Sequence, residues 1–434
     1  MDDVFASRLQ MALSLGFHMV FAGFGIGLPV LMALSEWLYL RRGHEHYRTL
    51  AKMWSAAAGL IFVIGALSGT VLAVELGLLW PTFMARAGST IGPAFTWEAV
   101  AFFIEAIFLG LYLYGWNYLS AWTHWATGVV VAISGMLSGI LVLAANAWMQ
   151  NPFATQVDAA GNLVATPSAL FSNPSWPVLA LHSTVACYAA TGFAVAGVYA
   201  WRWLQGRRDA HVRSALRIAL AVGGIAALIQ PFIGDTCAHL TRDTQPVKFA
   251  AMEAHFTTQA RAPLILGGLP NPRTGQVDGA LAVPALLSVL TYNDPQAVVI
   301  GLDRFPRALW PNVVLCHLAF QVMIIGGLLM VATTLAFWLT QYRRRWTRWI
   351  IITVLVISPL GFVALEAGWV VTEVGRQPWI VQGLMRTSEA ATTATGSTWT
   401  CAATALLYLV LASVLCRALV HMGRQPAPAE DHAG

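Results

Sequence analysis

Long apolar stretches constrain this sequence most, because a run of about 20 predominantly apolar residues can cross a bilayer as a helix. Nine such stretches are predicted, at about residues 15–40, 53–75, 95–115, 125–148, 178–201, 215–233, 311–340, 349–371 and 399–420. Hydrophobic residues make up 57% of the chain and charged residues 10%, whereas a soluble domain carries about a quarter charged residues. The sequence therefore predicts an all-α, polytopic membrane bundle of nine transmembrane helices.

The basic residues are distributed unevenly among the connections between these spans. Fifteen of the 25 lie in the connections one–two, five–six and seven–eight or after the ninth span: Arg41, Arg42, Arg48, Lys52, Arg202, Arg207, Arg208, Arg213, Arg217, Arg343, Arg344, Arg345, Arg348, Arg417 and Arg424. Short cytoplasmic loops are enriched in Lys and Arg. We therefore expect the N-terminus outside and the C-terminus in the cytoplasm, and no nucleic-acid-binding stripe. The first stretch begins too late for a signal peptide and is expected to be retained.

One connection is much longer than the others. Pro231 is expected to end the sixth span, and about 77 residues (234–310) follow on the outer side. A loop of this length is usually functional or disordered. The predicted organisation is a membrane domain in two parts, 1–233 and 311–423, an extracytoplasmic loop at 234–310 and a polar cytoplasmic tail at 424–434.

Carboxylates inside the spans form two pairs with the same spacing. Glu98 and Glu105 are seven residues apart, as are Glu366 and Glu373, and seven residues are about two helical turns on one face. Ionisable groups at membrane depth indicate functional sites. Such a ladder suits proton transfer or a cation site, although a carboxylate bonded only to its neighbours is the alternative, and for Glu366 both readings stay open.

Several potential iron ligands are expected to gather near the outer side. His18 and His182 should begin the first and fifth spans, and Met323 lies in the outer half of the seventh. Neutral imidazole and thioether are the ligands of a low-spin haem iron. His317 is interpreted as a packing residue.

Four separated motifs carry a family resemblance over nearly the whole chain. They are Gly-Trp-x-x-x-Glu-x-Gly-Arg-Gln-Pro-Trp at 368–379, Asn-Ala-Trp-Met-Gln-Asn-Pro at 146–152, Lys-Phe-Ala-Ala-Met-Glu at 248–253 preceded by Gly-Asp at 234–235, and Ser-Arg-Leu-Gln at 7–10 followed by His18. With them, the chain resembles subunit I of the cytochrome bd-type quinol oxidases, in their short Q-loop subfamily.

The resemblance implies haem cofactors and their ligands. His182 and Met323 would be the axial ligands of a low-spin haem b, and His18 and Glu373 would ligate the two high-spin haems. The implied set is two haem b and one haem d, or haem b in place of haem d. Arg376 would neutralise a haem propionate, which suits the planar guanidinium.

Proton, quinol and electron roles follow from the same resemblance. Glu98 and Glu105 correspond to carboxylates at the oxygen-reducing site and on the proton route to it, although other members space them by eight residues. Lys248 and Glu253 match the quinol-site pair in the long loop, the family's Q-loop. Trp369 would pack between haems.

The implied protein is a quinol:oxygen oxidoreductase in the bacterial plasma (inner) membrane. It would oxidise ubiquinol or menaquinol at the outer face, reduce O2 to water with protons from the cytoplasm, and contribute to the proton motive force. Subunit II and a small single-span subunit are the expected partners.

Two other functions remain open on the residues alone. One is a haem-containing quinol dehydrogenase that does not reduce O2. The other is a proton-coupled transporter, which would be expected to show inverted repeats and broken helices; neither is found in the sequence.

Overall fold

The computed structural model describes residues 3–343, 346–392 and 397–424, so Arg344, Arg345 and the tail from 425 lie outside the described residues. Within those ranges, nine helical spans are long and apolar enough to cross a membrane. They are α1 (Asp3–Arg42), α2 (Glu45–Leu79), α3 (Pro81–Tyr114), α4 (Ala121–Gln150), α6 (Ser175–Leu204), α7 (Ala210–Thr244), α10 (Val313–Tyr342), the consecutive pair α11 (Arg348–Ile357) and α12 (Leu360–Gly375), and α14 (Ser397–Arg424). The predicted all-α membrane bundle is confirmed.

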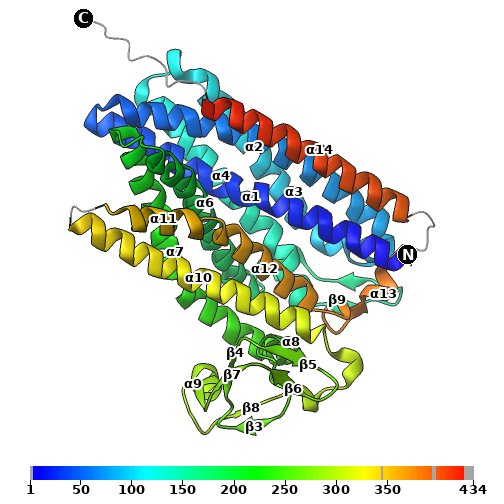
Figure 1. Cartoon of the computed structure of the whole chain (residues 1–434). Helices are drawn as coiled ribbons and strands as arrows, with labels where there is room; N and C mark the ends of the chain where they lie inside the picture. The colour runs from blue at the N-terminus through cyan, green and yellow to red at the C-terminus, as the bar shows by residue number, and fades with distance from the viewer. Residues whose placement is uncertain (1–2, 344–345, 393–396, 425–434) are drawn as a thin grey trace, which may run out of the picture.

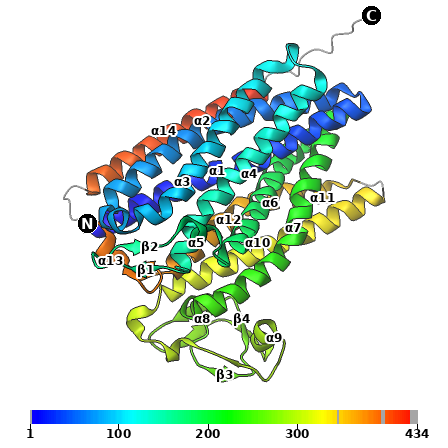
Figure 2. The same ribbon diagram turned by 180° about the vertical axis from the view of Figure 1, so that it is seen from behind.

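Consecutive spans run antiparallel and pack in pairs (Figures 1 and 2). The pairs α1–α2, α3–α4 and α6–α7 lie side by side, and α1 also packs against α4, α6 and α14. Small residues allow the closest approach: a Cβ added at Gly192 on α6 would lie 2.4 Å from the Cα of Gly223 on α7. Small residues at helix interfaces are typical of membrane bundles, where backbone proximity replaces hydrophobic burial as the source of packing energy.

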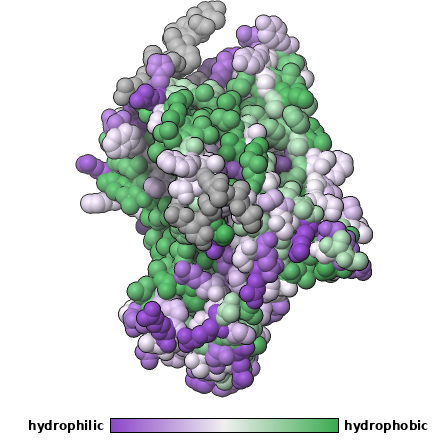
Figure 3. Space-filling model, turned by 90° about the vertical axis from the view of Figure 1, so that its right-hand side faces the viewer, coloured by the Kyte–Doolittle hydropathy of each residue, from purple (hydrophilic) through white to green (hydrophobic). Residues whose placement is uncertain are grey.

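Apolar side chains cover the outside of the bundle, as Figure 3 shows for one face. Exposed large hydrophobic residues recur on α2, α3, α10 and α14, among them Val63, Val74, Leu78, Phe103, Ile107, Leu111, Ile325, Leu328, Leu406, Leu409 and Val414. The hydrophilic residues gather at the ends and on the lobe that projects from the bundle. This distribution suits a chain that crosses a bilayer many times.

Helix ends differ from the sequence prediction in two spans that matter for the site. α1 begins at Asp3 and α3 at Pro81, so His18 and Glu98 lie near the middle of their helices and do not begin them. The physical reason is that apolarity marks the hydrocarbon layer and not the end of helical hydrogen bonding. A 40-residue helix is about 60 Å long, twice the thickness of the hydrocarbon core, about 30 Å.

Two prolines also act differently from expectation. Pro231 does not end the sixth span, because α7 continues through it to Thr244. Membrane helices tolerate proline where neighbouring groups satisfy the freed backbone. The eighth span, expected to be one helix, is instead interrupted at Ser358 and Pro359 between α11 and α12. Gly197 on α6 packs directly against this interruption, because a Cβ at position 197 would overlap the Ser358 hydroxyl.

The long loop is a folded lobe (Figure 1). After α8 (Pro246–Met252), three antiparallel strand pairs are nested: β3 (Gln259–Ala260) with β8 (Val298–Val299), β4 (Leu264–Leu266) with β7 (Leu281–Val283), and β5 (Leu269–Asn271) with β6 (Gln276–Asp278). The short helix α9 (Leu286–Tyr292) lies between β7 and β8. His317 on α10 ties this lobe to the bundle, because its Nδ1 and Nε2 lie 2.8 and 3.3 Å from the carbonyls of Met252 and Gly267. This is the packing role expected for His317.

Two further connections lie at the same end of the bundle as the lobe (Figure 2). One carries β1 (Gln156–Val157), β2 (Leu163–Val164) and α5 (Pro167–Phe171), and the other carries β9 (Trp379–Val381), β10 (Met385–Arg386) and α13 (Thr387–Ala390). The second connection is tied to the end of α4, where Gln382 donates its backbone N–H to the Met149 carbonyl. The arginine-rich connections are at the opposite end.

Candidate functional site

Glu373 and Arg376 form an ion pair near the end of α12. Arg376 Nη2 lies 2.5 Å from Glu373 Oε2, and Asn146 on α4 donates to Glu373 Oε1 at 2.8 Å. Arg376 is only 4% exposed, yet its Nε and Nη1 have no hydrogen-bond partner among the described residues. Leaving buried donors unsatisfied is costly. Two spare guanidinium donors therefore fit an anionic group such as a haem propionate.

Lys248 is buried directly beside this pair. Its Nζ donates to Gln150 Oε1 at 3.1 Å and to the Thr372 carbonyl at 3.2 Å, and Gln150 Nε2 donates to the same carbonyl at 3.2 Å. A Cβ at Gly375 would lie 2.8 Å from the lysine stem, so glycine is needed where Lys248 crosses α12. Burial lowers the pKa of Lys248 to about 8. The ammonium is thus held by neutral acceptors at the base of the lobe.

A cavity of about 230 Å³ opens over Lys248. It lies between α8 and the segment that follows α12, and Arg376 and Trp379 also line it, together with Gln377 and Gln382. The cavity combines a cationic and an aromatic lining, which suits a flat molecule with polar oxygen substituents.

Glu253 lies at the other end of α8 and does not contact Lys248. It is buried, its Oε2 has no hydrogen-bond partner in the part of the chain described, and burial raises its pKa to about 7. A carboxyl group with a pKa near neutrality can accept and release a proton at physiological pH. The structure therefore places one expected quinol-site residue on α8 and the other at its C-cap, and the hydrogen bonds of Lys248 go to Gln150 and Thr372 instead of Glu253.

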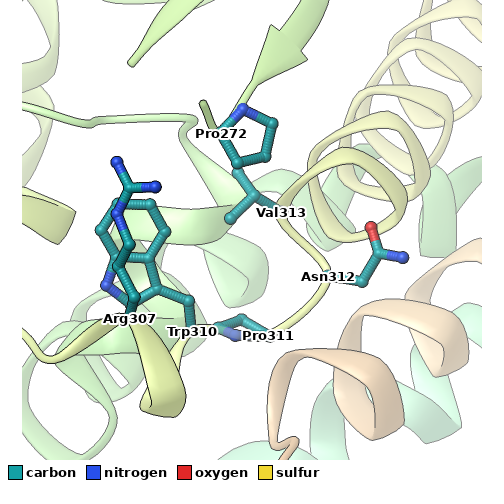
Figure 4. A pocket seen from close by; sticks show the side chains of 6 residues that line it. All are labelled: Pro272, Arg307, Trp310, Pro311, Asn312 and Val313. Atoms are coloured by element: carbon teal, nitrogen blue, oxygen red, sulfur yellow. The ribbon is translucent and has the colours of Figure 1, made fainter. Parts of the chain in front are cut away.

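A second hollow, of about 400 Å³, lies where the lobe returns to α10 (Figure 4). Arg307 lies over the Trp310 ring, 5.4 Å from its centroid, and the Asn312 side chain caps α10. No carboxylate or imidazole is among its lining residues, which come from the described part of the lobe. It offers no group for proton transfer and stands apart from the Lys248 cavity.

Glu98 and Glu105 both face α4. Ser138 Oγ donates to Glu98 Oε1 at 3.5 Å, and a Cβ at Gly135 would lie 3.1 Å from the Glu105 carboxyl group. Glu105 is buried, and Glu98 is partly buried. The expected carboxylate ladder is therefore a seam between α3 and α4.

Ser68 on α2 orients the His18 ring. Its Nδ1 lies 3.1 Å from Ser68 Oγ, and the Ser68 hydroxyl donates to the Gly65 carbonyl at 3.0 Å. Because that hydroxyl proton is directed to Gly65, its oxygen accepts Nδ1–H from His18. The lone pair of the neutral ring is then on Nε2, as a metal-binding imidazole requires.

His182 and Met323 lie on α6 and α10, and each of these helices packs on α7 and α12. Gln230 on α7 holds the His182 ring, with Nε2 3.2 Å from Nδ1. Met323 Sδ faces Gly368 on α12, where a Cβ would lie 3.1 Å from the sulfur. An imidazole and a thioether are the donors that a low-spin haem takes, so the donor set fits the expected group.

Two other residues singled out from the sequence lie on α12. Trp369 is half-buried and packs with Leu365 and Cys187, in a cluster shared by α1, α6 and α12. The Glu366 carboxyl group faces Gly16 on α1, and its Oε1 is buried without a partner within the described ranges. Glu366 therefore points toward the helix that carries His18.

Sequence reasoning did not identify four residues that hold these groups. Asn146 and Gln150 lie within the motif at 146–152, which is the sequence feature that could have indicated them, but the motif alone predicts no role for either. Ser68 and Gln230 carried no signal, because a polar side chain opposite a histidine is apparent only once the helices are packed.

Comparisons with known proteins identify relatives over nearly the whole chain. The family model described as "Cytochrome bd terminal oxidase subunit I" matches residues 6–427. The chain is 32% identical over 404 residues to the putative cytochrome bd menaquinol oxidase subunit I of Bacillus subtilis, covering 92% of this chain and 91% of that protein. It is 27% identical over 460 residues to the cytochrome bd-II ubiquinol oxidase subunit 1 of Escherichia coli, covering 90% of each. Its fold resembles the bd oxidase structure from Geobacillus thermodenitrificans, with a TM-score of 0.92, 35% identity and 98% of each chain covered.

Proposed function

The chain belongs to the cytochrome bd terminal oxidase subunit I family, and from that membership we propose a role for each part of the site. The protein is the membrane-embedded, haem-binding subunit of a terminal quinol oxidase and works with a subunit II. Its relatives include enzymes named for menaquinol and for ubiquinol.

The lobe formed by residues 234–310 is proposed to bind quinol at the cavity over Lys248. The observation that carries this proposal is the buried ammonium, which faces neutral acceptors beside an opening lined by Trp379. Lys248 would donate to a quinol oxygen. Glu253 would accept a quinol proton, because a carboxylate with a pKa of about 7 takes up a proton and returns it to water without a large barrier.

The haem-holding residues are proposed from donor chemistry. His182 and Met323 would hold a low-spin haem b, His18 and Glu373 the high-spin haems, and Arg376 a propionate. When bound, the haems supply the electron transfer and oxygen chemistry. The proposed set is two haem b and one haem d, or haem b in place of haem d. Trp369 would pack among them.

Protons for water formation are proposed to reach the site along the seam between α3 and α4. Glu105 would pass them to Glu98, which lies two turns along the same face of α3. In the proposed orientation, the lobe lies outside and the arginine-rich connections lie in the cytoplasm. A small single-span subunit is a further proposed partner.

The oxidase proposal is tested by spectra and oxygen uptake on the purified complex. We expect haem bands in reduced-minus-oxidised spectra, a spectral shift when carbon monoxide is added to the reduced protein, and quinol-dependent oxygen consumption. Haem bands without a carbon monoxide shift would favour a quinol dehydrogenase, and a colourless complex would contradict both.

Gln150→Leu is expected to weaken quinol binding with little change in haem content. The substitution removes the acceptor that orients the Lys248 ammonium, and a hydrogen bond to a charged group contributes about 1.5–3 kcal/mol. We expect kcat/KM for quinol to fall about tenfold or more, measured by oxygen uptake. Gln205→Leu, on the exposed end of α6, is the matched control. An unchanged kcat/KM would show that Gln150 does not position Lys248.

A further inference from the structure

A buried polar cluster at the arginine-rich end of the bundle has no role in the function described above. Glu36 on α1, Tyr112 on α3 and His124 on α4 are 1%, 0% and 2% exposed. We propose that Glu36 and His124 form a proton-holding pair that, together with Tyr112, loads protons into the inner end of the α3–α4 seam toward Glu105. This inference rests on the proposed oxidase function, because only oxygen reduction would consume those protons.

The hydrogen bonds of His124 fit a pair that shares one proton. His124 Nε2 lies 2.8 Å from the Tyr112 carbonyl, which can only accept, so Nε2 carries a hydrogen. His124 Nδ1 lies 2.7 Å from Glu36 Oε1. This contact needs one hydrogen, either on the imidazole beside a carboxylate or on a carboxyl group beside a neutral imidazole. The pair has no net charge in either form, so it can remain buried in the bundle.

Unused hydrogen-bonding capacity lies next to this shared proton. Glu36 Oε2 and the Tyr112 hydroxyl are both buried, and neither forms a hydrogen bond of ordinary geometry in the described structure. The two groups lie close enough for an electrostatic interaction and a weak hydrogen bond between them. A fixed packing cluster would be expected to satisfy such groups, so these two atoms can receive and pass on a proton.

The position of Tyr112 continues the α3–α4 seam that contains Glu98 and Glu105. Glu98, Glu105 and Tyr112 are spaced by seven residues on α3, which is about two turns for each step. Each faces a small residue of α4, in the order Ser138, Gly135 and Gly128. Because helical side chains lean toward the N-terminus, the Tyr112 ring leans along α3 toward Glu105. The cluster is therefore in line with the proton route.

Basic side chains lie near this cluster, among the other residues that surround Trp116. The Trp116 ring lies 4.0 Å from the His124 ring, and the cations of Arg48 and Lys52 lie 5.7 and 5.1 Å from the Trp116 ring. Trp116 is thus the shared neighbour of His124 and of both cations. Glu36 is the negative partner for any proton that enters at this end.

The proposed transfer conserves protons and involves no redox change. A proton from water binds Glu36 Oε2, which brings the pair from one shared proton to two. Glu36 then gives a proton to the Tyr112 oxygen as the hydroxyl's own hydrogen passes, through water in the seam, to the Glu105 carboxylate. The pair returns to one shared proton.

Isosteric variants separate this role from simple packing. His124→Gln and Glu36→Gln keep side chains of similar size that can still form hydrogen bonds, but neither can hold the mobile proton. Tyr112→Phe removes only a hydroxyl group, whose neighbour is the Glu36 carboxyl group, and keeps the ring that packs against α4, so it should not disturb assembly. Tyr199→Phe removes another buried hydroxyl, on α6, and is the matched control.

The experiment measures proton uptake by the complete oxidase in vesicles, with a pH-sensitive dye, during quinol-driven oxygen consumption. Each of the three cluster variants is expected to slow uptake at least about tenfold and to increase the solvent deuterium isotope effect, with haem spectra and the control unchanged. If a Gln variant fails to assemble, Tyr112→Phe decides the outcome. Wild-type uptake rates in the assembled variants would overturn the inference. A wild-type complex that consumes no oxygen would instead refute the oxidase function.

Discussion

His182→Ala is expected to remove the low-spin haem signal and to lower quinol-driven oxygen consumption by on the order of 100-fold or more. Loss of a residue that merely orients a metal ligand costs about 10–100-fold, so loss of the ligand itself should cost at least as much. The bundle should still fold, because His182 is only partly buried and its side-chain partner is Gln230. The measurement is a reduced-minus-oxidised spectrum of the purified complex, with haem quantified after extraction.

Two further variants make this result specific. Met323→Leu keeps the volume of the side chain and removes only the thioether, so it should also abolish the low-spin signal without a packing defect. His44→Ala replaces an exposed histidine in the connection between α1 and α2 and should leave the spectrum unchanged. A normal low-spin band in His182→Ala would mean that another residue ligates this haem.

The number and order of the membrane spans could be predicted from sequence because a bilayer imposes a length and a composition on each helix. Helix ends could not, because no comparable rule stops a helix once it leaves the hydrocarbon layer. Pro231 illustrates the limit: a proline usually marks an end, but in α7 neighbouring helices allow the helix to continue.

The residues of the candidate site also fall into those that the sequence could predict and those that it could not. Residues with distinctive chemistry, such as Lys248 and Glu373, could be identified from their type and motif. Their partners could not, because Asn146 and Gln150 act through contacts between segments more than 90 residues apart in sequence. The pairing of His124 could not be predicted for the same reason, because its partner Glu36 is 88 residues away in the sequence.

One face of α4 connects most of these groups. Asn146 binds Glu373 and Gln150 binds Lys248, while Gly135 makes room for Glu105. These positions fall on one side of a helix with 3.6 residues per turn. α4 therefore holds the Lys248 side chain, the Glu373–Arg376 pair and the α3–α4 seam in a fixed relation, which explains the amide side chains at positions 146 and 150 and the glycine at 135.

Glu253→Gln is expected to slow quinol oxidation about 100-fold at alkaline pH while leaving the haem spectrum intact. Positioned general bases contribute about 10²–10⁴-fold, and the amide has the size of the carboxyl group but cannot accept the proton. Oxygen uptake and haem content, measured on the same sample, test this. Glu45→Gln, on the exposed N-terminus of α2, is the control, and an unchanged rate would contradict the assignment.

The pH dependence gives the sharper form of this prediction. Burial raises the pKa of Glu253 to about 7 and lowers that of Lys248 to about 8. Wild-type quinol oxidation should therefore rise as pH increases through about 7, where Glu253 becomes a base, and fall above about 8, where Lys248 loses its charge. In Glu253→Gln, the rise in rate through about pH 7 should disappear and the fall above about pH 8 should remain. The ratio of the wild-type rate to the variant rate should therefore shrink below about pH 7. If the rate of the variant still rose with pH through about 7, a group other than Glu253 would cause that rise.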